Sequence, residues 1–144
     1  MKKGLSIVFV LLMVFLSACG AKTPIAKAKI PDNLRVDNVQ LVADNGILFC
    51  SFYVNYYTDS AEFLVSLSDG GKTISKHPMI QKDGRCEVWF EEVQNLSIEK
   101  QLDMKLMVKE SDEQKTEDIA KEICLVKSEN SDEWEVSFLP KAEP

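Results

Sequence analysis

The stretch that decides the fold is DNGILFCSFYVNYY, residues 44–57. Its Asn-Gly dipeptide is typical of a type I′ turn, because both central residues of that turn need positive φ. The run that follows, Ile47–Tyr57, is dense in aromatic and β-branched side chains, which favour strands. Val36–Ala43 precedes the turn and completes a predicted β-hairpin.

Strand and turn signals repeat along the rest of the chain. Asp69-Gly70-Gly71 separates two strand-like runs, and Asp83-Gly84 precedes another. Apolar and polar residues alternate at two further places, which predicts strands with one buried face. Besides the first hairpin, the predicted strands are Glu62–Ser68, Lys72–Lys76, Cys86–Val93, Leu102–Val108, Glu117–Lys127 and Trp134–Phe138.

The segment Glu117–Lys127 fits two structures. Ile119, Ile123 and Leu125 fit one face of a strand. One face of a helix would instead hold Ile119, Ala120, Ile123 and Cys124. We favour a strand, because Ile-Cys-Leu-Val is a compact β-prone run and no capping box precedes it. The chain then has seven or eight short strands, which indicates a β-sandwich or a small barrel.

The sequence DIAKEICLV, residues 118–126, resembles the Asp-x-Ala-x-Tyr-x-Cys segment of immunoglobulin domains, with Glu122 in place of the tyrosine. The resemblance implies an all-β, immunoglobulin-like β-sandwich. In that family the cysteine lies on strand F and bonds to a cysteine on strand B. It therefore implies a disulfide between Cys50 and Cys124, with Cys86 buried and free. The alternative is three free thiols in the core, where unpaired cysteine is common.

The N-terminus carries a targeting signal. Lys2 and Lys3 precede residues 4–18, which hold no charge and are short for a membrane span. The sequence Leu16-Ser17-Ala18-Cys19 resembles the lipobox of bacterial lipoproteins. In that family the cysteine thiol receives diacylglycerol, a peptidase cuts before the cysteine, and the new amino terminus is often acylated with a fatty acid such as palmitate. The alternative is an ordinary signal peptide.

The resemblance predicts an anchored domain on a tether. Residues 1–18 form the signal peptide, 19–35 the lipidated Cys19 with a basic flexible tether, 36–140 the β-sandwich and 141–144 a tail. The expected location is the outer face of the bacterial cell membrane, or the outer membrane of a two-membrane organism, with membrane lipid bound through Cys19. Residues 36–144 hold 11 Lys and Arg against 22 Asp and Glu, a net charge of −11. Such a domain repels nucleic acid, so we expect no nucleic-acid partner.

The residues that catalysis and metal binding require are scarce. His77 is the only histidine, and the sequence holds neither a Cys-x-x-Cys motif nor the spaced acids of a calcium loop. A serine-histidine-aspartate set would have to use His77, which stands next to Pro78 in a lysine-rich loop and is interpreted as a solvated turn residue. We therefore expect no enzyme, no cofactor and no metal site.

Aromatic residues are the best sign of a binding surface. If Leu48 and its alternates face the core, then Phe49, Tyr53 and Tyr57 line the opposite face, and Trp89 also points outward. The alternative is that both faces of this strand are covered or that its register is flipped. The row predicts a non-catalytic module that binds an envelope protein, a peptide or a sugar. A second hypothesis is an inhibitor or immunity-type lipoprotein whose acidic domain captures a cationic protein or peptide.

Overall fold

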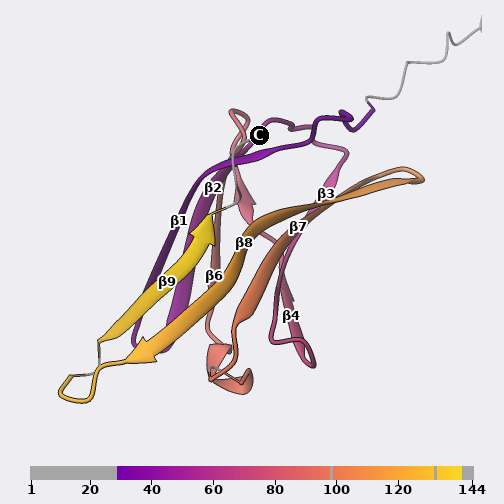
Figure 1. The fold of residues 1–144 in the computed structure, drawn as a ribbon. Helices are drawn as coiled ribbons and strands as arrows, with labels where there is room; N and C mark the ends of the chain where they lie inside the picture. The colour runs from indigo at the N-terminus through magenta and orange to yellow at the C-terminus, as the bar shows by residue number, and fades with distance from the viewer. Residues whose placement is uncertain (1–28, 98, 132, 141–144) are drawn as a thin grey trace, which may run out of the picture.

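The computed structural model describes residues 29–97, 99–131 and 133–140 (Figure 1). The predicted signal peptide, its lipobox with Cys19, most of the tether and the tail lie outside these residues. Within them, no helix is both long enough and apolar enough to cross a membrane.

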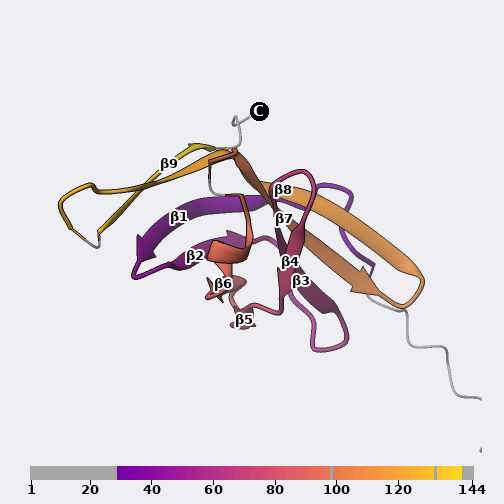
Figure 2. The ribbon, with the colours of Figure 1, turned by 90° about the horizontal axis from the view of Figure 1, so that it is seen from below.

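The described chain is almost entirely β-structure, in two antiparallel sheets (Figures 1 and 2). The strands are β1 (Val36–Asp44), β2 (Ile47–Val54), β3 (Glu62–Ser68), β4 (Thr73–Lys76), β5 (Met79–Ile80), β6 (Arg85–Phe90), β7 (Leu102–Glu110), β8 (Glu113–Lys127) and β9 (Trp134–Pro140), with one 3₁₀ turn, η1 (Val93–Asn95). One sheet has the order β1-β2-β6-β5 and the other the order β4-β3-β7-β8-β9. The predicted all-β sandwich is confirmed. The strand that the sequence did not indicate is β5, whose two residues are too few to show alternation.

The strand order matches that of immunoglobulin-like sandwiches. Strands β1, β2, β6 and β5 take the places of A, B, E and D, and β4, β3, β7 and β8 take those of C′, C, F and G. Strand β9 extends the second sheet beyond β8. Residues 118–126 therefore lie in the G place, one strand beyond the F place that the local resemblance implies.

The core lies between the two sheets and follows the two-residue period of the strands. On β2, Leu48, Cys50 and Phe52 are buried, and on β7 the alternate residues from Leu102 to Val108 are fully buried. Alternate side chains point to opposite faces of a strand, so the residues between them face outward. The register predicted for the second strand is correct.

The sandwich begins earlier in the chain than predicted. Ile30 is fully buried and Leu34 nearly so, although both fall within the predicted tether of residues 19–35. The Lys115 ammonium on β8 donates to the carbonyl oxygens of Ile30 and Pro31, both at 3.0 Å, and to the Asp32 carboxylate at 2.9 Å. Residues 30–35 therefore belong to the domain, because the side chains of Ile30 and Leu34 are buried in it and Lys115 binds this segment by hydrogen bonds.

Candidate functional site

The outer surface of the β1-β2-β6-β5 sheet brings three of the four predicted binding residues together. Phe49 on β2 lies directly opposite Trp89 on β6, and Tyr53 lies opposite Arg85. Residues that are directly opposite in an antiparallel pair project from the same face. We call this surface the β2–β6 face. Its outward side chains are Gln40, Val42 and Asp44 of β1, Ile47, Phe49, Ser51 and Tyr53 of β2, Met79 of β5, and Arg85, Glu87 and Trp89 of β6.

One half of the β2–β6 face is apolar. The rings of Phe49 and Trp89 are in contact, with centroids 5.1 Å apart and planes tilted by 43°. Trp89 is 41% exposed, Val42, opposite Phe49, is 56% exposed, and Met79 on the edge strand is 66% exposed. Single exposed apolar residues are ordinary, but a contiguous group on one sheet face is typical of a binding surface.

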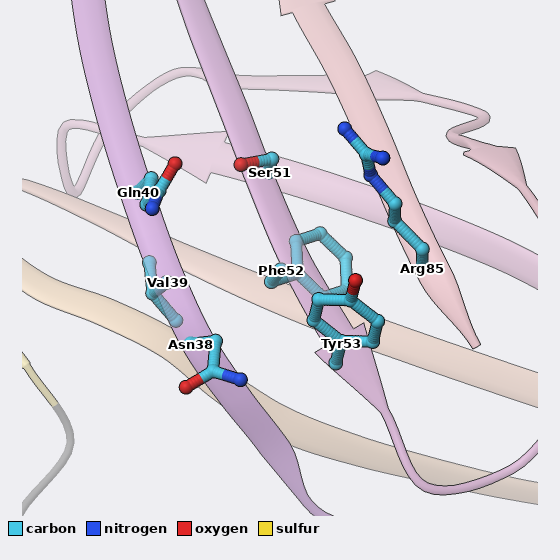
Figure 3. A pocket seen from close by; sticks show the side chains of 7 residues that line it. All are labelled: Asn38, Val39, Gln40, Ser51, Phe52, Tyr53 and Arg85. Atoms are coloured by element: carbon cyan, nitrogen blue, oxygen red, sulfur yellow. The ribbon is translucent and has the colours of Figure 1, made fainter. Parts of the chain in front are cut away.

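The other half of the face is polar and hollowed (Figure 3). A hollow of about 470 Å³ lies where β1, β2 and β6 run side by side, lined by Asn38, Val39, Gln40, Ser51, Phe52, Tyr53 and Arg85. It coincides with a β-bulge, because the register shifts between Asp37 and Gln40 on β1. Within the bulge Asn38 has φ +53°, a left-handed conformation that few residues other than glycine adopt. Bulges redirect side chains, and here the bulge opens the surface between β1 and β2.

Two ion pairs border the hollow. The Arg85 guanidinium lies 2.8 Å from the Glu87 carboxylate, and Arg35 Nε lies 2.7 Å from Asp37 Oδ2. Each pair joins residues two apart in the chain: Arg85 and Glu87 lie on the same face of β6, and Arg35 directly precedes β1, which holds Asp37. Each cation therefore has a neighbouring carboxylate, which leaves this half of the face polar without a net charge from these four groups.

Tyr57 does not lie on the β2–β6 face, so this part of the prediction is wrong. Strand β2 ends at Val54, and the Asn55 side chain then holds the chain by accepting from the Arg35 amide at 2.7 Å and donating to the Asn33 carbonyl at 2.8 Å. Alternation stops there. Tyr57 is half-buried, and its ring stacks on that of Phe63 at 6.4 Å between centroids.

The three thiols of the domain are free, and the predicted Cys50–Cys124 disulfide is absent. Cys50 is buried between the sheets. Cys124 lies between the buried Ile123 and Leu125 on β8, so its side chain points to the opposite face of its sheet. Burial is the main cause that raises the pKa of both Cys50 and Cys86 to about 12. These two thiols are neutral core residues.

The hydrogen bonds of Glu110 and the backbone contact of His77 connect segments of the fold, so both residues have structural roles. The buried Glu110 accepts hydrogen bonds from the Ser60 and Tyr56 hydroxyls, which lower the pKa of its carboxyl. These bonds join the segment after β2 to the end of β7. His77 Nδ1 lies 3.0 Å from the Phe63 carbonyl oxygen. In the part of the chain that the structure describes, no three His, Cys, Asp or Glu residues gather as metal ligands would.

The sequence-based prediction missed the polar half of the face. Asn38, Gln40, Ser51 and Arg85 carry no motif, and their types are common on solvated strand faces. One signal was present: in β1 the inward residues Val36 and Val39 are three apart instead of two. Such a break in alternation is what a bulge produces.

No family model, curated protein or solved structure matches this chain. The structure alone therefore gives the class of protein. It is an antiparallel β-sandwich whose β2–β6 face has exposed aromatic side chains beside a polar hollow.

Proposed function

We propose that this protein is a non-catalytic binding module, held at the outer face of a bacterial membrane by lipid on Cys19, and that the β2–β6 face binds its ligand. The observation that carries the proposal is the row of Val42, Phe49 and Trp89, which lie opposite one another on β1, β2 and β6 beside the polar hollow, with Val42 and Trp89 exposed. Exposing this much apolar surface in one place has no benefit for folding, since burial would stabilise the protein by about 25 cal/mol per Å². A ligand that covers it gains that free energy.

The lipid anchor is consistent with the path of the chain. Asp32 lies beside Lys115 near the β7–β8 turn, β1 runs from that end to the β1–β2 turn at the other, and β2 returns (Figure 1). A tether from Cys19 would join the domain at this end. The β2–β6 face would then lie along the side of the domain, where a large ligand in the envelope can reach it.

The anchor is tested by the full chain with Cys19→Ala. The unchanged protein should enter the detergent-rich phase when detergent extracts of cells are separated, because two or three acyl chains hold it there. The Cys19→Ala variant should lose the lipid mass and keep its signal peptide. An unchanged mass and an unchanged cleavage site would contradict lipidation.

The binding face is tested by photo-crosslinking in living cells. A benzophenone side chain, which inserts into nearby C–H bonds of protein, sugar or lipid, replaces Trp89 in the full chain. The matched control replaces Lys105, which is exposed on the outer face of the other sheet. We expect a light-dependent adduct at position 89 and none at position 105. No adduct at position 89, or equal adducts at both, would overturn the proposal.

The charge of the domain supports one second candidate, an inhibitor that captures a cationic protein or peptide. Residues 36–144 have a net charge of −11, and the exposed residues Asp44 and Glu133 are paired in a β-bridge between the end of β1 and the start of β9. Capture by charge should weaken at least tenfold between about 0.05 and 0.5 M salt, because salt screens exposed charges. Binding through Trp89 should change little over the same range.

A further inference from the structure

We infer that the ligand of the β2–β6 face is an uncharged, extended oligosaccharide, and that the hollow at the β1 bulge holds one of its sugar residues. The inference rests on the proposed function, and it adds the chemical class of the ligand. It draws on the lining groups of the hollow, their charge, and the spacing of the exposed aromatic rings.

The hollow is lined by groups that suit hydroxyls. Asn38 and Gln40 each offer a carbonyl acceptor and an NH₂ donor, and Ser51 and Tyr53 each offer a hydroxyl that donates and accepts. A sugar hydroxyl also donates and accepts, so it pairs with every one of these groups. The volume, about 470 Å³, lies in the range of small-molecule sites.

The charges of the site favour a neutral ligand. No carboxylate is among the seven lining residues, and the one cation, Arg85, is already paired with Glu87 at 2.8 Å. The domain as a whole, at −11, repels a polyanion. The free N–H groups of Arg85 remain available to donate to hydroxyl oxygens.

The aromatic side chains set the length of the ligand. Tyr53 borders the hollow and is 39% exposed, and Trp89 lies on the next strand beside Phe49. Tyr53 lies four positions after Phe49 along β2, a distance of about 13 Å at the usual rise of a strand. The apolar C–H face of a pyranose ring packs on an aromatic ring while its hydroxyls remain free for the polar groups. Only an extended chain of several sugars reaches both rings.

A flat protein surface fits the face less well. It would cover the amides of Asn38 and Gln40 without entering the hollow that they line, and buried polar groups left without hydrogen-bond partners weaken binding. A sugar chain satisfies these groups within the hollow and covers the apolar half with its C–H faces. The polar hollow therefore favours a sugar over a protein.

The test measures binding of three neutral hexasaccharides to the full chain in detergent by isothermal titration calorimetry. The probes are the β-1,4-linked hexamers of glucose and of N-acetylglucosamine and the α-1,4-linked hexamer of glucose, with hexagalacturonate as the acidic control. We expect at least one neutral hexamer to bind, and its monosaccharide to bind at least tenfold more weakly. Tyr53→Ala and Trp89→Ala should each weaken binding at least tenfold, and Lys105→Ala should not change it.

The outcomes separate this inference from the proposed function. If none of the neutral hexamers binds, or if hexagalacturonate binds more tightly than all of them, the inference of a neutral oligosaccharide ligand is wrong. A crosslinked protein at position 89 would then leave the binding face in place with a different ligand. If position 89 gives no adduct in cells and no hexamer binds, both proposals are wrong. Binding that survives Tyr53→Ala and Trp89→Ala would place the sugar elsewhere and overturn the inference.

Discussion

Phe49 and Trp89 lie opposite each other on β2 and β6, with ring centroids 5.1 Å apart, while their chain neighbours Leu48 and Phe90 form the next pair and are buried. Two adjacent aromatic residues of one strand therefore have opposite environments: Trp89 is 41% exposed and Phe90 is fully buried. One pair belongs to the surface that we propose for binding, and the other belongs to the core. This contrast makes the binding face separable from the stability of the fold.

Replacing each of these neighbours by alanine should give very different losses of stability. Phe90→Ala should lower the free energy of unfolding by about 3–5 kcal/mol, because it leaves a cavity in the core. Trp89→Ala should lower it by about 1 kcal/mol, since it removes one partly exposed cross-strand pair. Urea unfolding of both variants measures the difference. Equal losses would show that the register of β6 is not the one described.

Gly84→Ala should destabilise the fold more than Gly70→Ala. Both glycines have φ +88°, so an alanine at either position is strained to the same degree. A Cβ at Gly84 would also lie 2.1 Å from the Val54 carbonyl oxygen, whereas a Cβ at Gly70 would meet nothing within 4 Å. We expect a loss of about 1–2 kcal/mol for Gly70→Ala from conformation alone.

The additional loss for Gly84→Ala measures the close approach of β2 to the turn before β6. The Val54 amide donates to the Gly84 carbonyl at 2.9 Å, so the backbone there has little freedom to move away. Thermal unfolding of the two variants provides the comparison. A smaller loss at Gly84 than at Gly70 would contradict this contact.

The thiols should react in an order set by burial. With a pKa of about 12, Cys50 and Cys86 have a thiolate fraction of about 10⁻⁴ at pH 8, against about a quarter for an ordinary cysteine. In the folded protein, iodoacetamide should therefore modify Cys124, which is half-buried, before either of them. In denaturant without reductant all three should react, as mass spectrometry of peptides will show. Two thiols that resist alkylation in denaturant would instead be disulfide-bonded.

The Asp69 carboxylate should make the stability of the protein depend on acid pH. It accepts from the amides of Gly71, Lys72 and Ser97 at 2.8, 2.7 and 2.9 Å, and these bonds lower its pKa to about 2. Because the pKa is lower in the folded state than the unfolded value of about 3.9, the stabilisation is complete above that value and is lost as the pH falls toward 2.

The matched variant for this effect is Asp69→Asn, which keeps the shape of the side chain and removes its charge. We expect a lower melting temperature than that of the unchanged protein at pH 6, and a difference that narrows between pH 4 and pH 2. Melting curves recorded by circular dichroism across this range give the measurement. A difference that stays constant with pH would show that the charge of Asp69 does not stabilise the loop.

The sequence predicted the strands well wherever the two-residue period was long. The run from Leu102 to Val108 and the stretch from Ile47 to Val54 each show their buried face directly, and Glu117–Lys127 was correctly interpreted as a strand. Glu110 continues the same period on β7 and is buried, although the predicted strand ended at Val108. What was not visible was its pairing with Tyr56 and Ser60, which lie more than 45 residues away.

The side chains of the β2–β6 face were predicted in part, again from alternation along the strands. Phe49, Tyr53 and Trp89 were placed correctly because alternation alone decides their side of the sheet. Tyr57 was misplaced because the end of β2 depends on the hydrogen bonds of Asn55 to a segment 20 residues earlier. The implied Cys50–Cys124 bond failed because a local resemblance does not state which strand place a segment will occupy.

The sequence by itself determined that this protein is all-β, a sandwich or a small barrel, and it determined which side chains of β2 and β7 face the core. The physical reason is local: successive side chains of an extended backbone point in opposite directions, and the apolar set must be buried. Only the tertiary structure decided where the β1 bulge opens the hollow, how Lys115 attaches Ile30 to the domain, and which strands lie side by side. Those features depend on contacts between segments far apart in the chain, and no short stretch of sequence encodes them alone.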